Sequence, residues 1–238
     1  MQTRPKNAVR SFWLILIALF AAAALVAGCS SSSNKSSESL PDPATLLKQS
    51  NETTRALKSV HLDLKVDGQL QDLPIKTLGG DLSQQPAVAA QGNAKLIFQG
   101  SDVDANFVVF DNTLYVALSG DSYIDMGPAS DVYDIAAILN PDTGLANVLA
   151  SFSDPKSEGT ETINGVETVK VTGQVSADAV NKIAPPIKAT GPVPGTAWIA
   201  KDGDHKLVQA KLEPSSGNSV QMTLSDWDKP VNVTKPAV

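Results

Sequence analysis

Cysteine and histidine are scarce in this sequence. The chain of 238 residues has one cysteine, Cys29, and two histidines, His61 and His205. A single cysteine cannot form a disulfide within the chain, and it cannot supply the several thiolates of a cysteine-based metal site. Both histidines stand among polar neighbours, so we expect them to face water. We therefore expect no cofactor and no metal, and a fold that depends on its apolar core.

Motifs of catalysis and nucleotide binding are also missing. There is no G-x-S-x-G elbow, P-loop, H-E-x-x-H or dinucleotide fingerprint. The net charge of -6 argues against a nucleic-acid partner, because phosphate binding requires a basic surface. Asp102 and Asp104 share a strand face and would suit an acid–base pair or calcium, although such carboxylates usually form a solvated face. We predict no catalytic residues and no enzymatic activity.

The one long apolar run lies near the N-terminus. Three basic residues within the first ten positions precede an uncharged segment that ends in Val26-Ala27-Gly28-Cys29. A basic segment, an apolar segment and small residues before a cleavage site form the secretory pattern. An uncleaved anchor is the alternative, but the run is short for a spanning helix of about 20 residues. We predict that residues 1–28 are a signal peptide and that export ends with cleavage before Cys29.

The residues after Cys29 predict a tether. Residues 30–39 are rich in serine and contain no apolar side chain. Such a segment cannot bury a core and is typical of a flexible linker. We assign residues 29–40 to the tether and residues 41–238 to a single β-rich domain.

Alternation of apolar and polar residues dominates this domain. A period of two predicts strands near residues 60–66, 75–82, 94–99, 103–109, 114–118, 196–200, 206–212 and 219–227. Gly100-Ser101 and Asn164-Gly165 predict hairpin turns. Apolar stripes predict helices over residues 41–59, 132–139, 142–152 and 176–183, with Phe152 on the apolar face of the third. The expected architecture is α+β, a curved antiparallel sheet with helices on its apolar face.

Alternation also predicts which side chains point inward. A slip of one residue would place polar side chains such as Lys95 and Asn106 inside. The predicted inward set takes nine residues from strands and two from the helical cover: Leu62, Leu64, Ala94, Leu96, Phe98, Val103, Ala105, Phe107, Val109, Val148 and Leu149. Periodicity leaves open whether the helices seal this face or leave a gap.

Several long segments resemble a known family. They are Thr77–Leu82, Asp104–Asp111, Asn140–Leu149, Ile183–Pro186 and Gly217–Leu224. Together with the Val26–Cys29 segment, which resembles a bacterial lipobox, they are similar in order to the mycobacterial lipoproteins of the LprG/LprA/LppX family. The likeness runs from Cys29 nearly to Val238. It implies that Cys29 carries the acyl anchor and that the domain lies outside the cytoplasmic membrane.

The resemblance also implies a fold and a function. The fold would be a half-open antiparallel barrel like that of LolA and LolB, with helices across its concave face around an apolar cavity lined by the inward set. Family members bind triacylated glycolipids, namely phosphatidylinositol mannosides, lipomannan and lipoarabinomannan, and also triacylglycerol. The resemblance further implies a major-facilitator efflux transporter as a partner, recognition by Toll-like receptor 2, and shedding or secretion of part of the protein from the cell.

Two other classes of function stay open at this point. An envelope structural or chaperone lipoprotein would have the same signal and fold but a filled core. A lipid hydrolase would need a nucleophile beside a base, and the sequence offers none. The carrier hypothesis explains the missing motifs, because contact with unbranched acyl chains requires no catalytic group.

Overall fold

The fold is described by a computed structural model covering residues 40–70, 73–118 and 120–238. The predicted signal peptide, Cys29 and residues 30–39 of the tether lie outside the described residues. Leu40–Val238 forms one compact unit. None of the helices in this part of the chain is long and apolar enough to cross a membrane.

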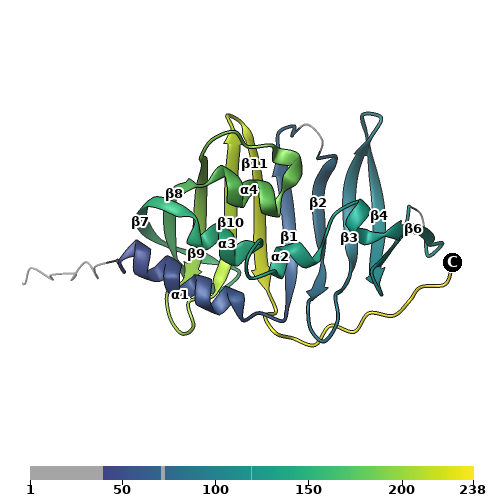
Figure 1. Ribbon diagram of the computed structural model, residues 1–238, viewed down its shortest axis with the longest axis horizontal. Coiled ribbons are helices and arrows are strands. Elements are labelled where there is room, and N and C mark those ends of the chain that lie inside the picture. The colour runs from purple at the N-terminus through teal and green to yellow at the C-terminus, as the bar shows by residue number, and fades with distance from the viewer. Residues whose placement is uncertain (1–39, 71–72, 119) are drawn as a thin grey trace, which may run out of the picture. The chain divides into compact units, whose positions relative to one another are not determined.

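A single antiparallel sheet of eleven strands forms the body of the domain (Figure 1). Its strands are β1 (Ser59–Asp67), β2 (Ile75–Ser83), β3 (Ala89–Phe98), β4 (Ser101–Phe110), β5 (Thr113–Ala117), β6 (Ile124–Pro128), β7 (Phe152–Ile163), β8 (Val166–Val175), β9 (Val193–Ala200), β10 (Leu207–Ser215) and β11 (Asn218–Ser225). The order is β6-β5-β4-β3-β2-β1-β11-β10-β9-β8-β7, so the first and last strands meet in the middle. β6 and β7 are edges that do not pair with each other, which leaves the barrel half open.

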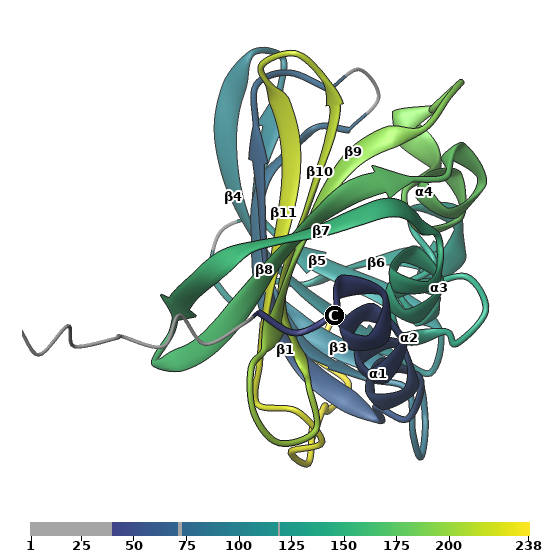
Figure 2. The same ribbon diagram turned by 90° about the vertical axis from the view of Figure 1, so that its left-hand side faces the viewer.

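The α-helices of the described residues, α1 to α4, lie on one side of this sheet (Figure 2). The helical elements are α1 (Pro43–Arg55), η1 (Ala129–Asp131), α2 (Ala136–Leu139), α3 (Leu145–Ala150), α4 (Ala177–Ile183) and η2 (Pro185–Ile187). The side chain of Asp42 caps α1 by accepting from the Thr45 amide at 2.8 Å. This hydrogen bonding with Thr45 holds the pKa of Asp42 below its usual value. Ser176 caps α4 in the same way.

The apolar core lies between the helices and the concave face of the sheet. Its most buried side chains come from the strands of the C-terminal half and from the helices, and include Leu46, Leu145, Val169, Val171, Val180 and Ile199. Burying apolar side chains of this size contributes about 1.5–3 kcal/mol each. The opposite, convex face carries the polar residues of the alternating strands.

The predicted fold class is confirmed, and two local predictions need correction. The structure is α+β with a large, curved and unclosed antiparallel sheet. Phe152 does not lie on a helix, because α3 ends at Ala150 and Phe152 begins β7. Strand β6 was not predicted at all, since Ile124-Asp125-Met126 is too short a run to stand out among the turns that surround it.

Candidate functional site

The concave face of the sheet has a sealed half and a less covered half. Over β7–β9, the helices α1, α3 and α4 cover the wall, and Val169, Val171 and Ala197 have no exposed surface. Over β2–β5, the cover is a single segment that runs from β6 through η1 and α2 (Figure 1). We call residues 129–144 the strap.

One row of side chains crosses both halves and demonstrates the difference. Cross-strand pairing places eight residues side by side on the concave face: Val171, Ala197, Ala210, Met222, Leu64, Leu78, Ala94 and Ala105. Val171 and Ala197 are fully buried, whereas Ala210, Leu64 and Leu78 in the middle of the row are only half-buried. Ala94 and Ala105 at its far end are buried. Leu96 and Val103, which pair in the next row, are half-buried as well. The apolar wall of β1–β4 is therefore incompletely covered.

The residues predicted to point inward fall into three groups. Five belong to the continuous buried core: Leu62, Phe107, Val109, Val148 and Leu149. Five others lie on the wall of β1–β4, namely Ala94 and Ala105, which are buried, and Leu64, Leu96 and Val103, which are half-buried. The last, Phe98, pairs with Ser101 beside the β3–β4 turn and is 65% exposed, so it lies at the rim. Their contact with lipid stays a prediction.

The edge strand β6 extends this wall and escaped the sequence analysis. Ile124 pairs with Val116, which pairs with Phe107, so Ile124 lies on the concave face. Ile124 and Met126 are 60% and 52% exposed. The alternation of these two residues with Asp125 was the available signal. An apolar surface thus continues from the covered wall to an open edge of the sheet.

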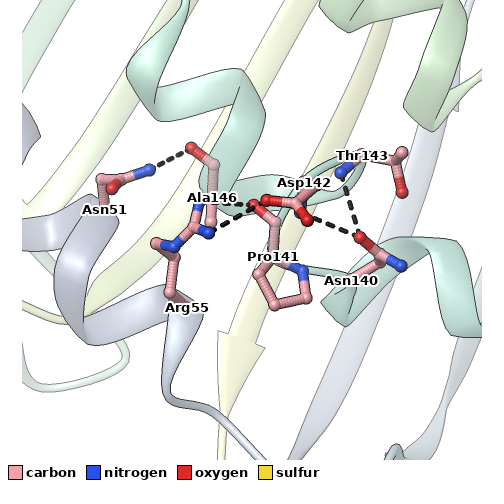
Figure 3. Close-up of polar contacts among 7 residues, drawn as sticks. All are labelled: Asn51, Arg55, Asn140, Pro141, Asp142, Thr143 and Ala146. Atoms are coloured by element: carbon pink, nitrogen blue, oxygen red, sulfur yellow. Dashed lines mark hydrogen bonds and ion pairs between the residues drawn. The ribbon is translucent and has the colours of Figure 1, made fainter.

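Polar contacts fasten the strap to the helices at two places, of which Figure 3 shows the first. At its C-terminal end, the Arg55 guanidinium of α1 donates to the Pro141 carbonyl and to the Asp142 carboxylate, both at 2.9 Å. Asn140 Oδ1 accepts from the backbone amides of Asp142 and Thr143. These hydrogen bonds stabilise the turn that contains both acceptors of Arg55. The ion pair is worth little, about 0–1 kcal/mol, because both partners are largely exposed.

The second fastening point is Tyr133. Its hydroxyl donates to the Ile183 carbonyl of α4 at 2.7 Å. Burial raises the pKa of Tyr133 far above its ordinary value, so the phenol keeps its proton and stays a donor. Such a hydrogen bond contributes about 1 kcal/mol.

The helical layer to which the strap is fastened contains unsatisfied polar groups. Between α1 and α3, the Asn51 amide donates to the Ala146 carbonyl (Figure 3). Yet Ser50 Oγ, Thr54 Oγ1 and Asn147 Nδ2 are buried without a hydrogen-bond partner among the described residues. Each costs about 1–3 kcal/mol relative to a solvated group. The helical layer is thus less firmly held than a wholly apolar one.

Two hollows of the described residues lie away from the concave wall. The larger, of about 720 Å³, lies on the polar face of β1–β4. The smaller, of about 460 Å³, lies between α1 and the β9–β10 connection. No group of three or more possible metal ligands occurs among the described residues. The least covered apolar surface described above is the wall of β1–β4.

Comparison with known proteins agrees with this architecture. The LppX_LprAFG lipoprotein model matches residues 42–233. A protein of Mycolicibacterium smegmatis named lipoarabinomannan carrier protein LprG is 60% identical over the full length of both chains. The Mycobacterium tuberculosis protein of the same name is 56% identical over 94% of each chain.

Two solved structures share the fold. LprF from Mycobacterium bovis is 30% identical, with a TM-score of 0.76 over 84% of this chain and all of that chain. LppX from Mycobacterium tuberculosis is also 30% identical, with a TM-score of 0.62 over 82% of this chain and all of that chain. The match to the family model covers most of the chain, and the identity to its members is high over nearly its whole length. This chain therefore belongs to the LppX_LprAFG lipoprotein family.

Proposed function

We propose that this chain is a membrane-anchored carrier of acylated envelope glycolipids. The observation that carries the proposal is the incompletely covered apolar wall of β1–β4, which continues to the exposed side chains of β6. The names of the relatives support a glycolipid such as lipoarabinomannan as cargo. Acylated Cys29 would hold the domain at the outer face of the cytoplasmic membrane.

The energetics explain why a carrier needs such a wall. Moving one methylene from water to an apolar surface is favourable by about 0.8 kcal/mol. The free energy of transferring an acyl chain of about 15 methylenes into water is therefore unfavourable by ~12 kcal/mol. A protein that extracts this chain from a bilayer must supply an equivalent apolar surface. The wall under the strap offers it without a catalytic group.

The strap supplies a route of entry. Its polar fastenings, Arg55 and Tyr133, contribute about 1 kcal/mol or less each. The unsatisfied groups between α1 and α3 lower the cost of separating the helices further. The free energy gained by burying an acyl chain therefore exceeds the free energy needed to break the polar contacts of the strap. Two finer assignments belong to the same proposal, namely triacylglycerol as a second cargo and a major-facilitator efflux transporter as a partner in delivery.

Mass spectrometry of lipids bound to the domain tests the proposal. The domain from Leu40 onward, without its anchor, is produced in a mycobacterial host, purified without detergent and extracted with organic solvent. We expect acylated glycolipids in stoichiometric amount. A domain that is folded and free of lipid, and that takes up none from vesicles containing glycolipid, would refute the carrier function and favour a structural lipoprotein.

A further inference from the structure

We propose that the hollow on the convex face of β1–β4 binds a neutral carbohydrate. It lies across the sheet from the apolar wall, and its volume of about 720 Å³ is within the range of small-ligand sites. Its lining comes from β11, β1, β2, β3 and β4 and from Tyr123 before β6. The proposal stands on this hollow, and the proposed function guides only the choice of probe.

The floor of the hollow is open because it contains a glycine. Gly79 pairs with Asp63 on one side and with Asn93 on the other. A Cβ atom at Gly79 would come within 3.0 Å of Asp63 Oδ1 and 3.9 Å of Asn93 Oδ1. The hydrogen that stands there instead leaves the space between these two side chains free for a ligand.

One end of the hollow carries polar groups that are already positioned. The His61 ring contacts the Asp81 carboxylate, with Nδ1 and Oδ1 2.7 Å apart. Gln209 Oε1 accepts from Gln221 Nε2 at 3.2 Å and from Thr223 Oγ1 at 3.0 Å. These contacts reduce the freedom that the side chains would lose on binding a ligand.

The other end presents amides that have no partner. Asn93 and Asn106 face each other across β3 and β4, and Gln91 lies beside them. None of the three side chains makes a hydrogen bond or ion pair with another described residue. Each primary amide offers two donors and one acceptor in a plane, which suits neighbouring hydroxyl groups of a sugar. The ring of Tyr123 borders the same end and offers an apolar surface for a pyranose or furanose.

The charges around the hollow exclude other ligands. Asp63 and Asp81 would repel a phosphate, and Lys65 in the same lining disfavours a cation. The described residues hold no group of three possible metal ligands there or elsewhere. An acyl chain would leave the polar groups of the lining without hydrogen-bond partners. A neutral polyhydroxylated ligand fits the remaining chemistry.

Calorimetric titration of sugars into the full acylated chain tests the site. The chain is held in nanodiscs of phosphatidylcholine, and the probes are oligosaccharides of mannose and of arabinose without acyl chains. We expect one of them to bind. The double substitution Asn93→Ala and Asn106→Ala should raise its Kd by about fivefold for each amide lost. Both side chains are exposed, so the fold should be unaffected.

Gln174→Ala is the matched control. Gln174 lies on the convex face of β8, on the opposite side of the strand from the buried Val175, and does not line the hollow. It should bind the sugar as the wild type does. Binding that survives in the double variant would place the sugar elsewhere and overturn the inference, as would the absence of binding by every probe.

A second arm identifies the source of the carbohydrate. The chain is first loaded with an acylated glycolipid and is then titrated with the free oligosaccharide. If loading blocks the sugar, the hollow holds the headgroup of the cargo; if the Kd is unchanged, it holds a separate glycan. Both outcomes support the site. A chain that binds sugar here and never carries acyl lipid would refute the proposed function and leave this inference intact.

Discussion

Replacement of Ala94 by tryptophan distinguishes a lipid carrier from a lipoprotein with a filled core. Ala94 is 8% exposed and lies between Leu78 and Ala105 on the concave face of the sheet. If the space above it is open, the indole occupies volume meant for an acyl chain, so the domain folds and loading fails. If the space is filled, the indole overpacks it and costs about 1–3 kcal/mol or more.

The loss of stability expected from overpacking can be measured with a matched substitution, Ala197→Trp, in the same cross-strand row. Ala197 stands on the same face in the same cross-strand row, but it is completely buried beneath the helices. Ala197→Trp should therefore incur the full overpacking cost. For a domain of this size, 1 kcal/mol lowers Tm by about 2–4 °C, so we expect a fall of roughly 2–12 °C. Ala94→Trp should keep Tm near the wild-type value.

The assay compares unfolding with loading. Thermal unfolding is measured on the domain from Leu40 onward after lipid extraction, and loading is measured as transfer of fluorescent acyl lipid from vesicles. We expect wild-type Tm with abolished transfer for Ala94→Trp. Two results would refute the reasoning: equal destabilisation by Ala94→Trp and Ala197→Trp, or wild-type transfer by the folded Ala94→Trp domain.

Three further changes probe the anchor and the strap. Cys29→Ala should abolish lipidation, read as loss of radiolabelled palmitate; normal labelling would disprove the lipobox assignment. Tyr133→Phe removes the hydrogen bond to Ile183 and should lower the free energy of unfolding by about 1 kcal/mol while accelerating lipid uptake in stopped-flow fluorescence. Arg55→Met keeps an apolar stem but frees Asp142, so uptake should accelerate with a stability change below about 1 kcal/mol; slower uptake would contradict a strap that opens.

Strand periodicity predicted most of the sheet because each strand has one wet and one apolar face. Asn164-Gly165 occupies the β7–β8 turn, as a hairpin requires, and Asn164 adopts a positive φ of 49°. Lys95 points away from the core, and its hydrogen bond to Asp104 raises its pKa. Alternation therefore assigned the faces of the central strands correctly.

Periodicity could not predict how each face is covered. Ala94 and Ala197 are the same residue type in the same cross-strand row, yet Ala197 belongs to the continuous buried core under the helices and Ala94 does not. The difference arises from the strap, whose path depends on tertiary contacts such as that of Arg55 with Pro141. The convex hollow was equally hidden, because its amides look like an ordinary solvated face until the sheet brings them together.

The edge at β6 joins the two proposed surfaces. Tyr123 lines the convex hollow, while the next residue, Ile124, belongs to the concave apolar wall. Neighbouring side chains on an extended strand point to opposite faces, so the chain presents a polar and an apolar surface within one residue step. A closed barrel would separate these surfaces completely. Because β6 has no further partner strand, an amphiphile can place its acyl chains under the strap and pass its sugar around this edge. If so, Ile124→Asp should impair acyl loading and leave the binding of free oligosaccharide unchanged, whereas equal loss of both would show that the edge merely supports the fold.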